Sequence, residues 1–473
     1  MRWRLRLIAT SNCMHPQQKL RTLMAIVTGG LLLSACGGSG SGSASDPSSG
    51  GTSNSYTLGG SITGLSASGL VLMDGTSTVS PASGAGTFTF SAALASGTSY
   101  DVAVQTQPAG ETCTVTSGAG TIGNSAVTSV DVACQPQEFV YAAGSGIFGY
   151  SVNSSGALTA LSGNPIENVA TSGNLLVDPA GQFLFVIESG DIAVYGINAN
   201  TGALTAVTGS PFSAGGQADF LALDPSGHFL YAAAVDSQVY GYTVDGTTGA
   251  LTTVLGSPYA AGQGPRGVAV DSTGNFAYVV NNGTVSAYAI NQTSGALSPV
   301  PGSPFSAGSV AGLTAAGTQG GDCFVAANPQ SNFIYVYNVT NSGATISPYA
   351  IDASTGALTA ASGGASYAGG SFCGTLAIDP SGLYLYATDP NNNQLWMFTA
   401  DLTTGSLGAG TGAPATTPNG SAVDPTGQYL YVAAGNAVAG FTINASTGEI
   451  PMTPGTNVNA PGTYAVAVAQ PTP

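Results

Sequence analysis

Polar and apolar residues alternate with a period of two along most of this chain. Two examples, each of which opens with an apolar run, are FLYAAAVDSQVYGYTVD, from Phe229 to Asp245, and YLYVAAGNAVAGFTIN, from Tyr429 to Asn444. Alternation with this period places successive side chains on opposite faces of a β-strand. No stretch after residue 57 has the periodicity of an amphipathic helix. The sequence therefore predicts an all-β protein.

A first short phrase recurs between the strands, as in NTGALTAVTGSP from Asn200. A polar pair followed by Gly and then by an apolar–polar alternation is typical of a β-hairpin whose Gly takes the left-handed conformation. The glycines of this phrase are Gly156, Gly202, Gly249, Gly295, Gly356, Gly405 and Gly448. Successive copies are 43 to 61 residues apart.

A second phrase, Asp-Pro-x-Gly or a close variant, keeps the same spacing. It begins at Asp178, Asp224, Asp271, Asn328, Asp379 and Asp424. It favours a type I turn, because Asp, Pro and Gly suit the first, second and fourth positions of that turn. Together the two phrases divide each unit into four strands. A four-stranded repeat of about 40–50 residues is typical of a propeller blade, so seven hairpin phrases predict seven blades.

The first blade lacks an innermost strand, because there are only six Asp-Pro phrases. The segment YAVAVAQP, from Tyr464 to Pro471, has the pattern of such a strand. We therefore predict a seven-bladed β-propeller over residues 138–473, in which this C-terminal segment pairs with the strand that begins at Glu138. Closing the ring in this way removes the exposed edges of an open sheet.

Residues 1–35 are interpreted as a targeting segment and left out of the fold. Lys19 and Arg21 precede the apolar run TLMAIVTGGLLL, which ends in LSAC at Cys36. This segment resembles the signal peptide of a bacterial lipoprotein, in which the Cys becomes lipidated. A transmembrane anchor is the alternative, but the run is short for one. With Gly37 following, the resemblance implies an outer-membrane lipoprotein of the cell envelope, facing the periplasm or the surface.

The segment between Cys36 and the propeller is expected to contain two parts. Residues 36–55 are rich in Gly and Ser, which is typical of a flexible tether. Residues 56–135 lack both propeller phrases and contain short strands broken by Gly and Ser. They are predicted to form a small β-sandwich-like domain, which resembles spacer or adhesive modules of bacterial surface proteins.

Charge is distributed very unevenly. Five of the six Lys and Arg residues lie in the first 21 positions, and Arg266 is the sixth. All 22 acidic residues follow Cys36, so the chain from Cys36 onward has a formal charge of 1 − 22 = −21. Nucleic acid is excluded as a partner, because there is no cationic surface for phosphates. Membrane association is therefore expected only through lipid on Cys36.

Four cysteines remain besides Cys13 and Cys36. They are Cys113 and Cys134 in the small domain, and Cys323 and Cys373 in the ring. Two cysteines in each domain of an exported protein predict two disulfides. No metal site is expected, since there is no C-x-x-C spacing and His228 is the only histidine after Cys36. No cofactor is expected either.

Candidate chemistry lies where the innermost strands enter the channel, five residues before each Asp-Pro phrase. The positions are Gly173, Asp219, Arg266, Cys323, Gly374, Asn419 and Tyr464. Among them Asp219, Arg266, Asn419 and Tyr464 are the candidate ligand-binding residues at this mouth. The long connection SVAGLTAAGTQGG, residues 309–321, is expected to form one side of the channel mouth. No catalytic residue is assigned; Arg266 and Asp219 are candidates, with a structural ion pair as the alternative.

The phrases DPSG…LY and TGAL, repeated over residues 138–473, resemble those of the lactonase-like seven-bladed propellers. That family includes 6-phosphogluconolactonases and muconate-lactonising enzymes. Its enzymes carry a PRH motif that leads to an HP turn. This chain has Pro265, Arg266 and Gly267 there, followed by Asp271 and Ser272. The Arg is present and both histidines are absent.

Three functions remain open from the sequence. The first is a lipid-anchored, exported binding module for a protein, a glycan or a surface ligand. The second is a hydrolase that opens an uncharged lactone or ester at the channel mouth, with Arg266 as the electrophile and a water activated by Asp219. The third is an architectural spacer. A dianionic sugar phosphate is disfavoured by the charge of −21 and the single Arg.

Overall fold

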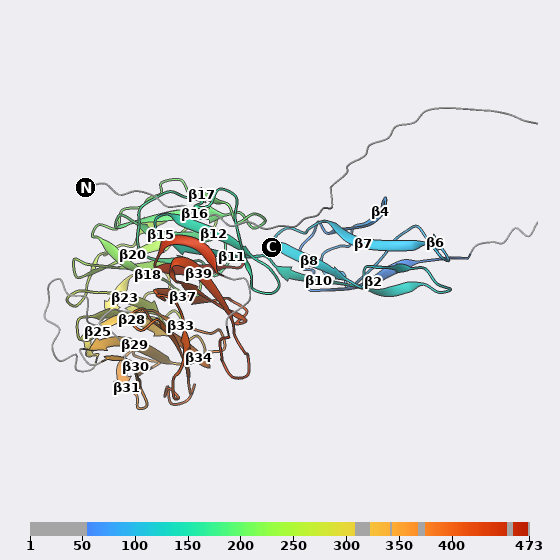
Figure 1. Cartoon of the computed structure of the whole chain (residues 1–473). Helices are drawn as coiled ribbons and strands as arrows, with labels where there is room; N and C mark the ends of the chain where they lie inside the picture. The colour runs from blue at the N-terminus through green and yellow to red at the C-terminus, as the bar shows by residue number, and fades with distance from the viewer. Residues whose placement is uncertain (1–53, 308–321, 341–342, 368–373, 452–456, 472–473) are drawn as a thin grey trace, which may run out of the picture. The chain divides into compact units, whose positions relative to one another are not determined.

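The computed structural model describes residues 54–307, 322–340, 343–367, 374–451 and 457–471. The described residues form β-strands and connecting turns without a helix, so the predicted all-β class is confirmed (Figure 1). In these ranges there is consequently no helix that could span a membrane.

The N-terminal strands form two four-stranded sheets that share one core. The first has the order β5 (Thr87–Thr89), β2 (Leu58–Thr63), β10 (Val127–Pro136) and β8 (Glu111–Thr116). The second has the order β4 (Ser77–Val79), β3 (Val71–Asp74), β7 (Ser99–Thr106) and β9 (Ala119–Thr121). A short pair, β1 (Ser55–Tyr56) and β6 (Leu94–Ala95), accompanies them. Leu58 and Val130 of the first sheet pack with Leu72 and Val102 of the second, which is the arrangement of a β-sandwich.

The remaining strands form seven antiparallel sheets, which are the blades of the propeller (Figure 1). The strands of each blade are given from the innermost outward. Blade 1 consists of β41 (Ala465–Ala469), β11 (Glu138–Ala143), β12 (Ile147–Val152) and β13 (Leu158–Ala160). Blade 2 consists of β14 (Thr171–Val177), β15 (Phe183–Glu188), β16 (Asp191–Ile197) and β17 (Leu204–Ala206), and blade 3 of β18 (Ala218–Leu223), β19 (Phe229–Ala234), β20 (Gln238–Val244) and β21 (Leu251–Thr253).

Blade 4 consists of β23 (Gly267–Val270), β24 (Phe276–Asn281), β25 (Thr284–Ile290) and β26 (Leu297–Pro299), and blade 5 of β28 (Asp322–Ala327), β29 (Phe333–Thr340), β30 (Gly343–Ile351) and β31 (Leu358–Ala360). Blade 6 consists of β33 (Leu376–Ile378), β34 (Tyr384–Asp389), β35 (Gln394–Thr399) and β36 (Thr411–Pro414), and blade 7 of β37 (Gly420–Val423), β38 (Tyr429–Ala433), β39 (Gly435–Thr442) and β40 (Val458–Thr463). Blades 3, 4 and 5 each carry one additional short strand: β22 (Tyr259–Ala260), β27 (Phe305–Ser306) and β32 (Ala365–Tyr367).

The ring closes as the sequence predicts. Strand β41 pairs with β11 in antiparallel register, with Ala467 opposite Tyr141. Each innermost strand also contacts the next one, from β14 through β18, β23, β28, β33, β37 and β41 back to β14. The second strand of most blades is buried along its whole length because a neighbouring blade covers each of its faces, which explains apolar runs such as Phe229–Ala234.

The recurrent Gly of the hairpin phrase is required by packing between blades. Each such Gly has a positive φ, and an aromatic ring of the preceding blade occupies the space where its Cβ would lie. The seven pairs are Gly202 with Phe139, Gly249 with Phe183, Gly295 with Phe229, Gly356 with Phe276, Gly405 with Phe333, Gly448 with Tyr384, and Gly156 with Tyr429. Any other residue would meet both backbone strain and an overlap with the ring.

A tyrosine two residues after that ring forms a hydrogen bond to the same hairpin at five of the seven junctions. The hydroxyl donates to the Gly carbonyl in the pairs Tyr141–Gly202, Tyr231–Gly295, Tyr278–Gly356, Tyr386–Gly448 and Tyr431–Gly156, at 2.8 to 3.1 Å. The last of these joins blade 7 to blade 1 across the closure. Phe185 has no hydroxyl to donate, and the Tyr335 hydroxyl is buried near Asn328 without a partner in hydrogen-bond geometry in the part of the chain that the structure describes.

The Asp-Pro phrases form turns in which the acidic side chain accepts hydrogen bonds from nearby backbone N–H groups. In blade 3, Asp224 accepts hydrogen bonds from the backbone N–H groups of Ser226 and Phe229, at 3.1 and 2.7 Å. Asp379 makes the equivalent bonds to Ser381 and Tyr384. These carboxylates therefore stabilise turns and are not available as acid–base groups.

Candidate functional site

Asp219 and Arg266 are neighbours at the end of the channel where the innermost strands begin. Asp219 lies on β18, and Arg266 immediately precedes β23 of the next blade. Burial raises the pKa of the Asp219 carboxyl above its ordinary value, and the positive charge of Arg266 opposes part of that rise. Both side chains are half-buried.

The Arg266 guanidinium does not form a structural ion pair with any of the described residues. Its backbone N–H donates to the Val280 carbonyl, at 2.9 Å. Its guanidinium makes neither a hydrogen bond nor a salt bridge within 4.0 Å to any part of the chain that the structure describes. Five N–H donors of this half-buried group therefore remain available to a ligand.

Two aromatic rings meet one residue further along the inner strands. Phe220 of blade 3 and Phe324 of blade 5 form an edge-to-face pair, with ring centroids 5.7 Å apart and planes at 77°. Blade 4 lies between them and has Gly267 at the corresponding position, where an added Cβ would be 3.2 Å from the Phe324 Cα. Because Gly267 has no side chain, the two rings can reach each other. Both rings are partly buried: Phe220 packs on the core between blades 3 and 4, and Phe324 packs on the core between blades 5 and 6.

Two close backbone approaches and one side-chain hydrogen bond occur at other predicted positions of the mouth. Gly173 lies against the carbonyl of Asp219, and Gly374 lies against that of Thr388. The Asn419 side-chain amide donates to the carbonyl of Thr463, at 3.0 Å; Thr463 is the last residue of β40 and lies two residues before the closing strand β41. Asn419 therefore already has a structural partner.

Two buried hydroxyls near the closure have no partner in hydrogen-bond geometry among the described residues. They are Ser172 Oγ on β14 and the Tyr464 hydroxyl, which lies near Thr171. Tyr464 immediately precedes β41, and β41 contacts β14. Unpaired buried hydroxyls are rare in native proteins, so these two groups mark a polar part of the channel entrance.

The predicted bond between Cys323 and Cys373 involves a residue outside the described ranges. Cys323 lies on β28, adjacent to the blade that carries Arg266, and Cys373 is not described. The pairing stays a prediction. Residues 309–321 of the long connection and Cys36, the predicted lipidation site, also lie outside the described ranges.

His228 takes no part in the mouth. It is exposed in the Asp-Pro turn of blade 3, with Nδ1 2.9 Å from the Ser226 hydroxyl. Asp-Pro turns join the far ends of the innermost strands, so His228 lies at the opposite end of the channel from Asp219.

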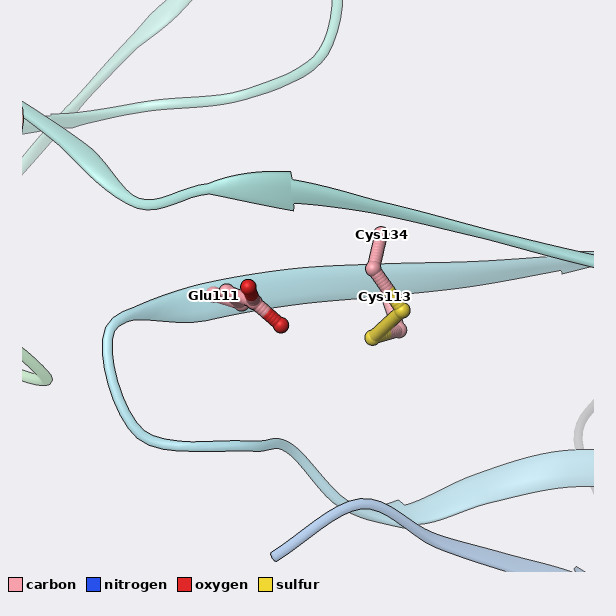
Figure 2. Close-up of side chains that lie close together, drawn as sticks. All are labelled: Glu111, Cys113 and Cys134. Carbon is pink, nitrogen blue, oxygen red and sulfur yellow. A yellow bond between two sulfur atoms is a disulfide. The ribbon is translucent and has the colours of Figure 1, made fainter. Parts of the chain in front are cut away.

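Cys113 and Cys134 of the small domain are joined by a disulfide, with an S–S distance of 2.04 Å. Figure 2 shows Glu111 beside this bond. Among the described residues, these three form the single group of potential metal ligands whose donor atoms lie close together. The two sulfur atoms are bonded to each other, so they are not available as thiolates in this state.

The repeat predicted that Asp219 and Arg266 occupy equivalent positions in adjacent blades, but it did not lead to the contact between Phe220 and Phe324. The signal was present one position later along the repeat, where Phe220, Gly267 and Phe324 occupy equivalent places in three successive blades. Two large residues flanking a Gly at equivalent positions indicate rings that meet above it. The buried hydroxyls of Ser172 and Tyr464 carry no comparable signal in the sequence.

The comparisons with known proteins agree with this architecture. A family described as lactonase, seven-bladed β-propeller, matches residues 215–416 and 362–468, which together are more than half of the chain. No curated protein matches the sequence.

Solved structures of similar fold cover about 70% of the chain. A proposed 6-phosphogluconolactonase from Bacteroides uniformis is 14% identical, covers 71% of this chain and all of its own, and has a TM-score of 0.59. The periplasmic gluconolactonase of Pseudomonas aeruginosa is 17% identical, covers 70% of this chain and 99% of its own, and has a TM-score of 0.56. At these identities the likeness shows the fold alone.

Proposed function

Because the chain belongs to the lactonase family of seven-bladed β-propellers, we propose that its channel mouth binds a small, uncharged, oxygen-rich molecule. The observation that best supports this proposal is the half-buried Arg266 guanidinium, which has no hydrogen-bond partner among the described residues and lies close enough to Asp219 for their charges to interact. Arg266 supplies donors and Asp219 supplies acceptors.

The charge of the protein favours an uncharged ligand over an anionic one. Arg266 and Asp219 together contribute no net charge at neutral pH when both are ionised. The formal charge of −21 after Cys36 repels an anion at long range. The names of the two structural relatives concern sugar lactones, and an unphosphorylated sugar lactone is uncharged and has several oxygen atoms that can pair with Arg266 and Asp219.

Lactone hydrolysis is the second candidate, and the environment of Asp219 favours it. A carboxylate whose pKa is raised by burial is a stronger base than an exposed one. In this mechanism Asp219 takes a proton from water while the water oxygen attacks the lactone carbonyl. Arg266 donates hydrogen bonds to the carbonyl oxygen as it gains negative charge. The ring oxygen then leaves and takes the proton back from Asp219, which yields the open hydroxy acid.

The test uses purified protein with glucono-1,5-lactone as the probe. Calorimetric titration measures binding, and a pH-stat measures acid release above the spontaneous rate. Arg266→Gln is expected to weaken binding about 10-fold or more, since it removes the charged donors. Asp219→Asn is expected to preserve binding better and to abolish any catalysed acid release. The exposed Glu449→Gln is the matched control.

The outcomes separate the candidates. Binding without catalysed acid release supports a binding module, and release that depends on Asp219 supports a lactonase. Failure of the parent protein to bind this lactone or a neutral monosaccharide would contradict both, and would leave the binding of a macromolecular or surface ligand and the role of architectural spacer.

We propose separately that the protein is an outer-membrane lipoprotein whose Cys36 carries lipid. The proposal rests on the basic and apolar segment that ends in LSAC. Cys36→Ser is expected to shift the protein from the membrane fraction to the soluble fraction, or to leave an uncleaved precursor. Unchanged fractionation and the absence of lipid on a peptide beginning at residue 36 would contradict it.

A further inference from the structure

Glu111, Cys113 and Cys134 lie on one face of a sheet in the small domain. Glu111 and Cys113 are two residues apart on β8, so their side chains point to the same side. Cys134 of β10 is directly opposite Cys113 in the antiparallel register. The carboxylate oxygen and the two sulfur atoms lie within 4.8 Å of one another, and all three residues are buried. Figure 2 shows the Glu111 carboxylate beside the sulfur atoms.

One oxygen of the Glu111 carboxylate is fully engaged, and the other is not. Oε1 accepts hydrogen bonds from the backbone N–H groups of Ser66 and Ala67, at 2.9 and 3.2 Å, and from the Ser66 hydroxyl. Oε2 is buried without any hydrogen-bond partner among the described residues, in a side chain that is 2% exposed. Burying a carboxylate oxygen without a hydrogen-bond partner costs free energy. Oε2 can therefore accept a ligand or donor that the oxidised domain does not supply.

Reduction of the disulfide would supply two suitable groups at this position. A dithiol reductant transfers two electrons and two protons to the S–S bond, which yields two thiols and leaves the reductant as its own disulfide. Each thiol can lose its proton to become a metal ligand. Two thiolates and one carboxylate are a donor set typical of Zn²⁺, which accepts both sulfur and oxygen.

We propose that the reduced small domain holds Zn²⁺ between Cys113, Cys134 and Glu111. In a tetrahedral site with metal–ligand distances of about 2.0–2.3 Å, the ligand atoms are roughly 3.3–3.8 Å apart. The observed limit of 4.8 Å requires only side-chain rearrangement to reach this spacing. The fourth position is filled by water. Zn²⁺ binding displaces two protons from the thiols and replaces the disulfide as the link between β8 and β10.

The contacts of Oε1 provide the support that a metal ligand needs. Backbone donors from Ser66 and Ala67 hold the carboxylate in one orientation, with Oε2 directed away from them. Such outer contacts fix the geometry of a ligating carboxylate and typically raise metal affinity. Glu111 therefore has two roles, as an anchor for the loop at Ser66 and as the third ligand.

The test uses the full chain in which the other four cysteines are replaced, so that only one pair can bind metal. These replacements are Cys13→Ser, Cys36→Ser, Cys323→Ser and Cys373→Ser. The protein is reduced with a phosphine and titrated with Co²⁺ as a spectroscopic probe and then with Zn²⁺. We expect one Co²⁺ per chain with a thiolate-to-metal charge-transfer band, and its displacement by one Zn²⁺. The oxidised protein is expected to show neither.

Glu111→Gln separates ligation from a structural role. This variant is expected to retain the Oε1 contacts but to weaken Zn²⁺ binding about 10-fold or more, because a neutral amide is a poor ligand for this ion. The exposed Asp101→Asn of the same domain is the matched control. Circular dichroism of the reduced, metal-free protein establishes whether the domain keeps its strands. A reduced protein that binds no Co²⁺, or Glu111→Gln with parental affinity, would overturn the proposal.

Discussion

Glu138 is the group whose replacement tests the closure of the ring most directly. It is the first residue of β11, and its side chain is 8% exposed. Oε1 accepts a hydrogen bond from the Gln470 amide at 2.8 Å, which joins the first propeller strand to the end of the last. Burial, together with the negative charge of Asp424, raises the pKa of Glu138 from 4.5 to about 8, although the Gln470 hydrogen bond acts in the opposite direction.

This pKa makes ring stability depend on pH. Between pH 4.5 and 8 the unfolded chain has released the Glu138 proton, whereas the folded ring retains it. The folded state then binds more protons, so the free energy of unfolding falls as pH rises through this range. For one such group, each pH unit in this range lowers the free energy of unfolding by at most about 1.4 kcal/mol. The total decrease between pH 4.5 and pH 8 is therefore at most about 5 kcal/mol. Below pH 4.5 the group is protonated in both states and contributes no slope.

Glu138→Gln removes the titrating proton and preserves an acceptor for Gln470. Urea denaturation of parent and variant from pH 4.5 to 8.5 is expected to show a variant that gains relative stability as pH rises, by several kcal/mol at most. Other carboxyls titrate in both proteins, so the difference between the two curves isolates Glu138. The exposed Glu449→Gln is the matched control. A difference between parent and Glu138→Gln that does not change with pH would refute the reasoning.

Two further substitutions test the contacts between blades. Tyr431→Phe is expected to lower the free energy of unfolding by about 1–3 kcal/mol, because it leaves the Gly156 carbonyl without its donor. Tyr335→Phe removes a hydroxyl that has no partner in hydrogen-bond geometry among the described residues, so it is expected to cost less, and equal losses in thermal melts would contradict the assignment. Gly356→Ala should lower the melting temperature much more than Gly163→Ala, because both positions have positive φ but only Gly356 has a ring, that of Phe276, where the Cβ would lie. Similar shifts for the two variants would show that backbone conformation alone explains the recurrent Gly.

The fold was predictable because its signals are local and repeated. The Asp-Pro turn of blade 3 is specified by Asp224, whose carboxylate binds backbone groups within five residues. The alternation of each strand and the spacing of the hairpin glycines are equally short-range. Even the closure by residues 465–469 was visible, because six turns and seven hairpins leave one strand to be supplied by the other end.

The site was only partly predictable, because its properties depend on neighbours in other blades. The repeat placed Asp219 and Arg266 at equivalent positions, but it could not show that Arg266 lacks a polar partner among the described residues or that Asn419 has one in Thr463. Likewise, the even count of cysteines suggested a bond between Cys113 and Cys134 without indicating that a buried carboxylate lies beside it.

The amino-acid sequence thus determined the all-β class, the seven repeats and the order in which they join, because turn chemistry and strand periodicity act over a few residues. The tertiary structure decided which polar groups are satisfied and which are left available in the part of the chain that it describes. The edge-to-face pair of Phe220 and Phe324, the unpaired guanidinium of Arg266 and the unpaired Oε2 of Glu111 all arise from contacts between segments tens of residues apart or more. Burial and hydrogen-bond partners are set by packing in three dimensions, and no local pattern in the chain encodes them.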